Sequence, residues 1–275
     1  MDAAIPLLKD APSSRGYIAK GTALAIKMRS ALYYGDYDRA KATAQAIMDL
    51  GQYELDSNYS NLFTVAGQGS KEIIASVQRI ENLKTFGVIG QMYNNAGWSS
   101  IVPTQKLIDM YEMDNGLTKE EAGTYYDPAH PFAHRDPRMA MTVIFPGQDW
   151  NGRIFNTLDK QINGEDNKDF PGGADNASKT ALTWYKYLGP KSQYSDMWNT
   201  NACPIIFRYA EVLLTYAEAE NELNGPSAIV YDLLDQVRLR AGHKAVDRSK
   251  YGTQATLREL IRRERTIEFA GEGLR

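Results

Sequence analysis

The sequence predicts a mainly α fold, in which tetratricopeptide-like helical hairpins form a scaffold and a loop-rich insert with short strands interrupts it. Two segments, 17–51 and 204–275, repeat apolar residues at the spacing of amphipathic helices. The segment between them, 52–203, holds all four tryptophans, most of the prolines and long polar stretches. Because proline removes a backbone donor and breaks helices, we expect this middle segment to be largely loops.

The N-terminal hairpin is expected to consist of two helices, at 17–34 and 37–50, each with one apolar stripe. Gly51 stands where a helix C-terminus favours glycine. The small residues Ala40 and Ala44 allow the two helices to approach closely, as they do in a tetratricopeptide repeat. One such hairpin cannot bury both of its faces, so we expect it to pack on other helices.

The C-terminal segment is expected to supply these helices. An amphipathic pattern covers 205–223, and the Asn-Gly-Pro sequence that follows ends it. A second helix, with Ser227 as its N-cap, runs to Gly242. The third is expected to open with a capping box formed by Thr256 and Glu259.

The insert carries weaker signals. Strand-like runs occur at 72–78 and 140–145, and a helix is expected at 104–113. The stretch 160–179 is polar and rich in Gly, Asn and Asp. A long irregular stretch within a compact domain is usually a functional loop or is disordered, so ligand specificity is expected in 52–203.

Composition excludes several classes of protein. No run approaches the roughly 20 apolar residues that a transmembrane helix needs. A net charge of −3 gives no positive field that would attract nucleic acid, so no nucleic-acid partner is expected. Cys203 is the single cysteine, which excludes an intrachain disulfide and a multi-cysteine metal site. The sequence also lacks a signal peptide, a phosphate-binding loop and a Gly-x-Ser-x-Gly motif.

The tryptophans are the leading candidates for ligand contact. Sugar rings present C–H faces that pack on flat aromatic surfaces, while amides and carboxylates satisfy the hydroxyls. Trp98 and Trp150 have amide or carboxylate neighbours in the sequence. The alternative is that each tryptophan anchors the core of the insert, and this is favoured for Trp184 and Trp198. The ligand-binding candidates are therefore Tyr93, Asn94, Asn95, Trp98, Asp149, Trp150 and Asn151.

Other clusters favour structural roles. Glu218 and Glu222, four residues apart on a helix, fit ion pairs with nearby arginines better than a glycosidase carboxylate pair. His130 and His134 share that spacing, but neighbouring prolines argue against a helix and a metal site. The segment 159–169 has oxygen ligands suited to calcium without the spacing of an EF-hand, which favours a flexible polar loop. We therefore expect a binding protein rather than an enzyme, without a cofactor or a metal.

Five ordered blocks of the sequence resemble the SusD/RagB-like outer-membrane nutrient-binding lipoproteins. They span nearly the whole chain, although Gly271 stands where the family usually has a bulky residue. The blocks are KGTALA (20–25) with YGDY (34–37), PTQKLIDMYEM (103–113), DPRM (136–139) with FPG (145–147), FRYAEVLLTYAEAENE (207–222), and VRLRAG (237–242) with RERTIE (263–268).

The resemblance implies a single SusD-like domain over 1–275 that binds oligosaccharides at the cell surface. It further implies delivery of the glycan to a SusC-like TonB-dependent transporter of the outer membrane, on which the helical scaffold docks. Membrane attachment in this family is through a lipid on an N-terminal cysteine, which this chain does not contain. The family's first scaffold helices and its final helix are also missing, so the chain is expected to be a fragment.

Two alternatives stay open from the sequence. The chain could be a member of the family that binds peptides rather than glycans, or a helical-repeat scaffold that binds only proteins. Replacing Trp98 and Trp150 with alanine separates the scaffold hypothesis from ligand binding, because a pure scaffold would bind no small ligand through these residues.

Overall fold

The computed structural model describes residues 1–93, 97–173 and 176–274. Helices account for 39% of the chain and strands for 9%, which confirms the expected mainly α fold. Within the described residues, no helix combines the length and the apolar character needed to cross a membrane.

The chain folds into two compact units. The loop-rich unit ends at Cys203, which is also the C-terminal limit of the insert expected from the sequence. The helical unit comprises residues 1–58, 69–77 and 204–275, and the loop-rich unit comprises residues 59–68 and 78–203.

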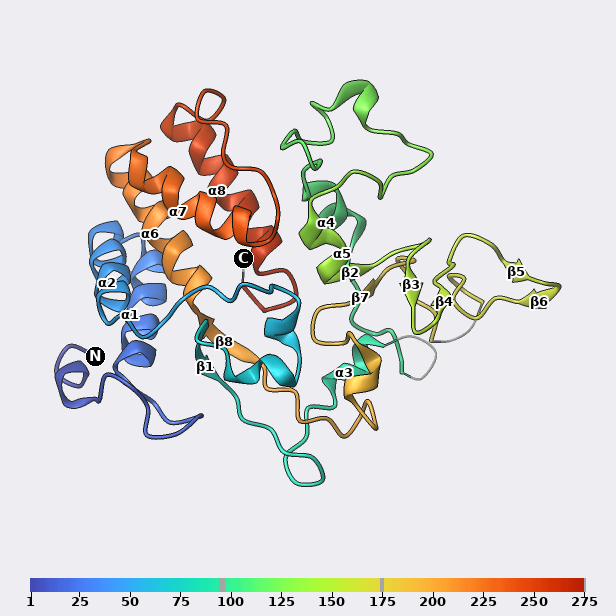
Figure 1. Ribbon diagram of the computed structural model, residues 1–275, viewed down its shortest axis with the longest axis horizontal. Helices are drawn as coiled ribbons and strands as arrows, with labels where there is room; N and C mark the ends of the chain where they lie inside the picture. The colour runs from blue at the N-terminus through green and yellow to red at the C-terminus, as the bar shows by residue number, and fades with distance from the viewer. Residues whose placement is uncertain (94–96, 174–175, 275) are drawn as a thin grey trace. The chain divides into compact units, whose positions relative to one another are not determined.

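In the helical unit, α1 (Lys20–Tyr34) and α2 (Tyr37–Asp49) form the expected hairpin (Figure 1). Gly35 ends α1 at a φ of 80°, a left-handed conformation that glycine adopts without steric cost, and its N–H donates to carbonyls of the last turn. The carboxylate of Asp36 accepts a hydrogen bond from the N–H of Arg39 at 3.1 Å and caps α2. The tight hairpin is therefore set by two adjacent residues.

The centre of this unit is α6 (Tyr209–Asn224), which contacts α1 and α2 as well as α7 (Ala228–Arg240) and α8 (Gln254–Glu268). In Figure 1 the blue pair α1 and α2 lies beside the orange helices α6 and α7. Ala40 and Ala44 of α2 are fully buried, as expected for close helix packing. The core around α6, α7 and α8 includes Leu213, Leu214, Val230, Leu234, Val237, Leu257, Leu260, Ile261 and Phe269.

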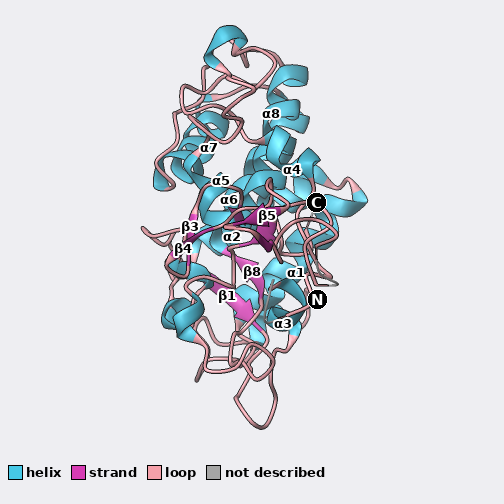
Figure 2. Ribbon diagram, turned by 90° about the vertical axis from the view of Figure 1, so that its right-hand side faces the viewer, coloured by secondary structure: helices cyan, strands magenta, loops and turns pink. Residues whose placement is uncertain are grey.

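A short antiparallel ladder precedes α6. Strand β1 (Ile73–Ser76) pairs with β8 (Ile205–Arg208), as Figure 2 shows, which confirms the strand expected at 72–78. The expectation that the helix begins at Ile205 is wrong, because its first four residues form β8. Burial alternates there: Ile206 is exposed, whereas the residues on either side are buried. A hydrogen-bonding partner distant in sequence therefore overrides the local helical pattern.

The helix α8 also begins earlier than expected. The hydroxyl of Thr253 accepts from the N–H of Thr256, and the hydroxyl of Thr256 accepts from the N–H of Thr253, both at 3.2 Å. This reciprocal pair is a capping box, so the expected box at Thr256 and Glu259 is wrong. Glu259 instead forms an exposed ion pair with Arg262 at 3.2 Å.

A buried ion network joins β8 to the end of α8. Arg208 is 1% exposed and donates hydrogen bonds to Glu72 at 2.8 Å, to Glu268 at 2.7 Å and to Glu272 at 2.8 Å. Burial lowers the pKa of the Arg208 guanidinium, but the three carboxylates outweigh burial and hold it well above its usual value. Arg240 of α7 bonds the same Glu72 at 2.7 Å. The network therefore joins the residue before β1 to β8, α7 and the end of α8.

Among its described residues, the loop-rich unit has only short elements. The described strands form three separate two-stranded antiparallel ladders, β2 with β7, β3 with β4, and β5 with β6. The elements are α3 (Val88–Met92), α4 (Gln105–Met110), α5 (Pro137–Thr142), β2 (Val143–Ile144), β3 (Asp149–Trp150), β4 (Arg153–Ile154), β5 (Gln161–Ile162), β6 (Glu165–Asp166) and β7 (Thr183–Trp184).

Two expectations for this unit need correction. The strand expected at 140–145 is only β2, because α5 occupies the residues before it. Pro137 is favourable in the first turn of α5, and the Asp136 carboxylate caps it by accepting from the N–H of Arg138 at 2.9 Å. The helix expected at 104–113 is shorter and stops at Met110.

In this unit the buried side chain of Arg135 bonds backbone carbonyls from two segments of the chain. Arg135 donates to the backbone carbonyls of Pro131 at 2.9 Å, Ile108 at 2.6 Å and Tyr111 at 2.7 Å. Since buried carbonyls need a donor and no strand supplies one here, the five-donor guanidinium fixes α4 to the segment before α5.

Candidate functional site

The four tryptophans differ in the exposed fraction of their side chains. Trp98 is 61% exposed, whereas Trp150 retains 4% and Trp184 retains 8%. Trp184 is buried in β7, in agreement with its expected role in the core of the insert, and Trp198 is half-buried. Of the four, Trp98 offers the largest accessible aromatic surface, and the candidate site is therefore centred on it.

Trp98 does not stand alone, because its ring packs on that of Trp198. The ring centroids are 4.9 Å apart and the planes are inclined by 60°. A tilted aromatic pair at this separation is attractive beyond the area it buries. Trp198 thus holds Trp98 on the surface and prevents it from turning inward.

Two glycines place this pair. The N–H of Trp98 donates to the carbonyl of Gly90 at 2.9 Å, in the middle of α3. The indole of Trp198 lies directly on Gly90, where an added Cβ would come within 2.4 Å of the ring. Gly97 is also tightly enclosed, since its Cβ would lie 2.2 Å from the Gly90 carbonyl oxygen. Only glycine allows the two tryptophan segments to approach α3 this closely.

The residue that follows Trp198 in the chain belongs to a bonded pair of amide side chains. Asn199, next to Trp198, donates from Nδ2 to Oδ1 of Asn82 at 2.6 Å, and its Oδ1 accepts from the N–H of Asn82 at 2.7 Å. Asn82 has a φ of 61°, which asparagine tolerates better than most residues. Each amide has two donors and two acceptor positions, so both retain hydrogen-bonding capacity toward sugar hydroxyls after this reciprocal bonding.

Two other ligand-binding candidates, Tyr93 and Trp150, belong to a buried aromatic cluster. The rings of Tyr93 and Trp150 lie 6.0 Å apart, and Tyr185 packs edge-on against Trp150 at 5.9 Å. The Nδ2 of Asn151 donates to the Tyr93 hydroxyl at 3.1 Å, and the ammonium of Lys191 lies 5.0 Å from the centre of the Tyr93 ring. The structure therefore brings Tyr93, Trp150 and Asn151 together, with both rings in the interior.

The remaining candidates lie around this cluster. Asp149 is exposed, and its carboxylate accepts from the N–H of Gly152 at 3.2 Å in the turn between β3 and β4. Asn151 is exposed as well. The candidates Asn94 and Asn95 lie outside the described residues.

The sequence interpretation missed Trp198 as a partner of Trp98. The signal that selected Trp98 and Trp150 was an aromatic ring with amide or carboxylate neighbours. Trp198 has the same context, because Asn199 follows it and the carboxylate of Asp196 accepts from its backbone N–H at 2.8 Å. Applying the criterion evenly would have included it.

The acids of α6 form ion pairs, as expected. Glu218 lies 3.2 Å from Arg265, and Glu222 pairs with Arg258. Burial raises the pKa of the Glu218 carboxyl, and the nearby Arg265 only partly opposes this effect. Glu211 is 1% exposed and pairs with Arg29 of α1. These carboxylates connect helices rather than face a cleft.

The histidines and the polar loop give no metal centre within the described residues. His130 contacts the carboxylate of Asp127 at 2.7 Å, and His134 contacts that of Asp114 at 3.3 Å. No group of three or more potential ligands gathers anywhere in the described part of the chain. The expected polar loop contains the β5–β6 hairpin, and Asn167 ties it down by donating to two backbone carbonyls at 2.8 Å.

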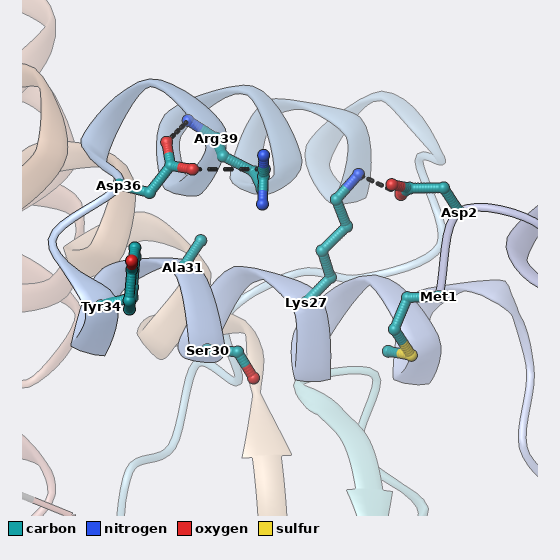
Figure 3. A pocket seen from close by; sticks show the side chains of 8 residues that line it. All are labelled: Met1, Asp2, Lys27, Ser30, Ala31, Tyr34, Asp36 and Arg39. Atoms are coloured by element: carbon teal, nitrogen blue, oxygen red, sulfur yellow. Dashed lines mark hydrogen bonds and ion pairs between the residues drawn. The ribbon is translucent and has the colours of Figure 1, made fainter.

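A pocket of about 450 Å³ lies between α1 and α2 in the helical unit (Figure 3). Two cations line it, and both face carboxylates: Lys27 pairs with Asp2, and Arg39 lies 3.3 Å from Asp36. Because their charges are already matched, this pocket is a weaker candidate for an anionic ligand than the Trp98–Trp198 pair is for a sugar.

Comparison with known proteins identifies the family. The SusD family profile matches residues 48–275. SusD-like protein P2 of Formosa agariphila is 25% identical over 289 residues, covering 96% of this chain and 51% of the relative. SusD-like protein P25 of the same organism is 26% identical over 274 residues, covering 94% and 48%. The chain thus spans about half the length of these relatives.

Solved structures show the same fold. A SusD-like carbohydrate-binding protein from Bacteroides fragilis is 28% identical and superposes with a TM-score of 0.86, covering 99% of this chain and 54% of that protein. A surface glycan-binding protein from Bacteroides uniformis is 17% identical, with a TM-score of 0.70, and covers 100% and 53%. The second likeness supports the fold alone.

Proposed function

The chain belongs to the SusD family, and from that premise we propose that it binds oligosaccharides on the exposed surface of the Trp98–Trp198 pair. SusD-family proteins are binding proteins rather than enzymes. The observation that carries the proposal is the 61% exposure of Trp98 on the supporting ring of Trp198, which the amide of Asn199 follows in the chain. An exposed indole offers a flat apolar face on which a sugar ring can pack.

The chemistry of the pair matches a pyranose. The C–H face of a sugar packs on an indole, and the amides of Asn82 and Asn199 reach hydroxyls at its edge. We further propose that Asp149 and Asn151 contact the glycan beside the buried aromatic cluster, with Tyr93 and Trp150 supporting them from the interior. Asn94 and Asn95 remain sequence-based candidates for the same role.

Isothermal titration against a panel of oligosaccharides tests the proposal. Trp98→Ala should weaken binding at least tenfold, since a central tryptophan contact commonly contributes about 2 kcal/mol or more. Trp98→Phe should retain part of the affinity, because it keeps a flat ring. The matched control is Tyr34→Ala, which removes an aromatic side chain that is 89% exposed on α1. Equal affinities for the three variants and the wild type would reject Trp98 as the glycan platform.

We propose in addition that the glycan is delivered to a SusC-like TonB-dependent transporter at the outer-membrane surface, with membrane attachment through a lipid anchor. Family membership supports this role. Co-purification of the protein with a SusC-like transporter from the same organism tests it, and a stable complex is expected with or without glycan. Failure to co-purify under conditions that preserve other transporter complexes would reject the transporter as a partner. It would not affect the proposal that the chain binds glycans.

The protein-binding scaffold is a second candidate, favoured by one observation. Helix α1 exposes Ile26 by 40%, Tyr33 by 62% and Tyr34 by 89% on one side of the helical unit. If the scaffold acts alone, Tyr33→Ala with Tyr34→Ala should abolish partner binding, whereas Trp98→Ala should have no effect. A peptide-binding member of the family would instead show Trp98-dependent binding of peptides and none of glycans.

A further inference from the structure

The loop-rich unit contains a second pocket, of about 700 Å³, that the glycan surface does not use. One of its walls is formed by two aromatic rings, Phe132 and Phe145, which stack with centroids 4.5 Å apart and planes inclined by 16°. Ile154 and Leu158, which also line it, are 60% and 72% exposed. Its volume lies within the roughly 300–1,000 Å³ typical of small-molecule sites.

The pocket is held open by backbone anchors rather than by side-chain packing alone. Phe132 follows Pro131, whose carbonyl accepts from buried Arg135 at 2.9 Å. The N–H of Phe145 donates to the side chain of Gln148 at 2.8 Å, and the N–H of Gly147 donates to the carbonyl of Phe155 at 2.9 Å. The two stacked rings are thus carried by fixed segments and form a wall that exists before any ligand arrives.

Two amide side chains that line the pocket already have hydrogen-bonding partners. The Nδ2 of Asn156 donates to Asp159 at 2.8 Å, and the side chain of Gln105 donates to Asp109 at 3.1 Å. A sugar in this pocket would bury several hydroxyls with few remaining partners, and each unpaired hydroxyl is costly. The pocket therefore favours an apolar group over a glycan.

Charge narrows the choice of ligand. The described residues that line the pocket include one carboxylate, Asp159, and neither lysine nor arginine. His130 also lines it, and the carboxylate of Asp127 lies 2.7 Å from its ring. Lys160 follows Asp159 in the chain but is exposed and is not part of the lining. A positively charged group at the mouth would therefore meet the carboxylate of Asp159 and no lining lysine or arginine.

From these walls and this rim, we infer that the pocket binds an aromatic or large aliphatic group carried next to an ammonium, as at the amino-terminal aromatic residue of a peptide. The hydrophobic group packs on Phe132, Phe145 and Leu158, and the ammonium lies beside Asp159. This site is separate from the Trp98–Trp198 surface, and the inference does not depend on glycan binding.

The test uses the 275-residue chain and three matched probes: L-phenylalaninamide, which is cationic, N-acetyl-L-phenylalaninamide, which is neutral, and N-acetyl-L-phenylalanine, which is anionic. Affinities are measured by ligand-observed NMR titration. The expected order is cation, then neutral, then anion, with about a fivefold to tenfold step between the first two. A preference for the anion, or binding of none of the three, would overturn the inference.

Variants locate the site. Leu158→Ala should weaken phenylalaninamide binding about threefold to tenfold, because it removes apolar contact from an exposed position that adds little to folding. Its control is Leu83→Ala, which removes the same side chain at 81% exposure outside the pocket lining. Asp159→Asn should remove the preference for the cation over the neutral probe. Equal effects of Leu158→Ala and Leu83→Ala would place the binding elsewhere.

Two further measurements separate this site from the glycan surface. Trp98→Ala should leave phenylalaninamide binding unchanged, and the amide should not compete with an oligosaccharide in titration. Loss of amine binding in Trp98→Ala would show that the probe occupies the tryptophan pair instead. If neither the wild type nor any variant binds a glycan, but the three probes keep the expected order of affinities, the proposed function is rejected and the inference about this pocket is supported.

Discussion

Removing Arg208 should destabilise the helical unit more than any surface ion pair does. This guanidinium donates five described hydrogen bonds: two to Glu272, one each to Glu72 and the carboxylate of Glu268, and one to the backbone carbonyl of Glu268. Arg208→Met keeps an apolar stem of similar length but leaves these carboxylates buried without their shared cation. Breaking a buried pair by removing one partner costs about 3–5 kcal/mol.

The lower end of that range is expected here. Arg240 remains and bonds Glu72 at 2.7 Å and Glu268 at 2.5 Å, so two of the carboxylates keep one cation. A loss of about 3 kcal/mol is a large part of the 5–15 kcal/mol by which domains are stable. For a unit of this size it lowers the melting temperature by roughly 6–12 °C.

Urea unfolding followed by far-ultraviolet circular dichroism measures the loss. The control is Arg248→Met, because Arg248 is 53% exposed and pairs with Asp232 at 2.9 Å on the surface, where such pairs contribute about 0–1 kcal/mol. The linear extrapolation should give a clear difference between the two variants. If Arg208→Met costs less than about 1 kcal/mol, or no more than the control, the network is not what joins β8 to α8.

Two other perturbations test particular contacts. Because burial raises the pKa of Glu218, its ionised form disfavours folding at neutral pH, and that penalty disappears as the pH falls below the folded-state pKa. Glu218→Gln should therefore be more stable than the wild type at neutral pH, with a gap in thermal unfolding that closes on acidification; a gap that widens in acid contradicts this. Gly90→Ala should displace Trp198, which lies where the new Cβ would be, and weaken glycan binding because Trp98 loses the ring that supports it. Unchanged affinity in that titration would show that Trp198 does not support the site.

The helical scaffold could be predicted because local signals decide it. Gly35 and Asp36 fix the α1–α2 turn whatever surrounds them, and Ala40 and Ala44 already indicate a closely packed neighbour. The errors arose where distant residues decide. Residues 205–208 have apolar spacing compatible with a helix, but pairing with β1, about 130 positions earlier in the chain, makes them a strand.

In the candidate site, too, some features follow from the local sequence and others depend on distant residues. Trp98 and Trp150 have similar polar neighbours, yet one is exposed and the other is buried. Trp150 ends the two-residue strand β3, and successive side chains of a strand point to opposite faces, so Asp149 faces solvent while Trp150 faces inward. Composition around a tryptophan therefore indicates a surface segment but does not decide which of its side chains reaches the ligand.

What decides it for Trp98 is a contact that no local pattern contains. Trp198 lies 100 positions along the chain, and only the absence of a side chain at Gly90 lets its indole reach the turn that carries Trp98. A glycine inside a short helix is normally a cost, since it weakens the helix by about 0.5–1 kcal/mol relative to alanine. Its presence in α3 is explained by the aromatic pair it accommodates, which connects the backbone of the loop-rich unit directly to the surface proposed to bind glycans.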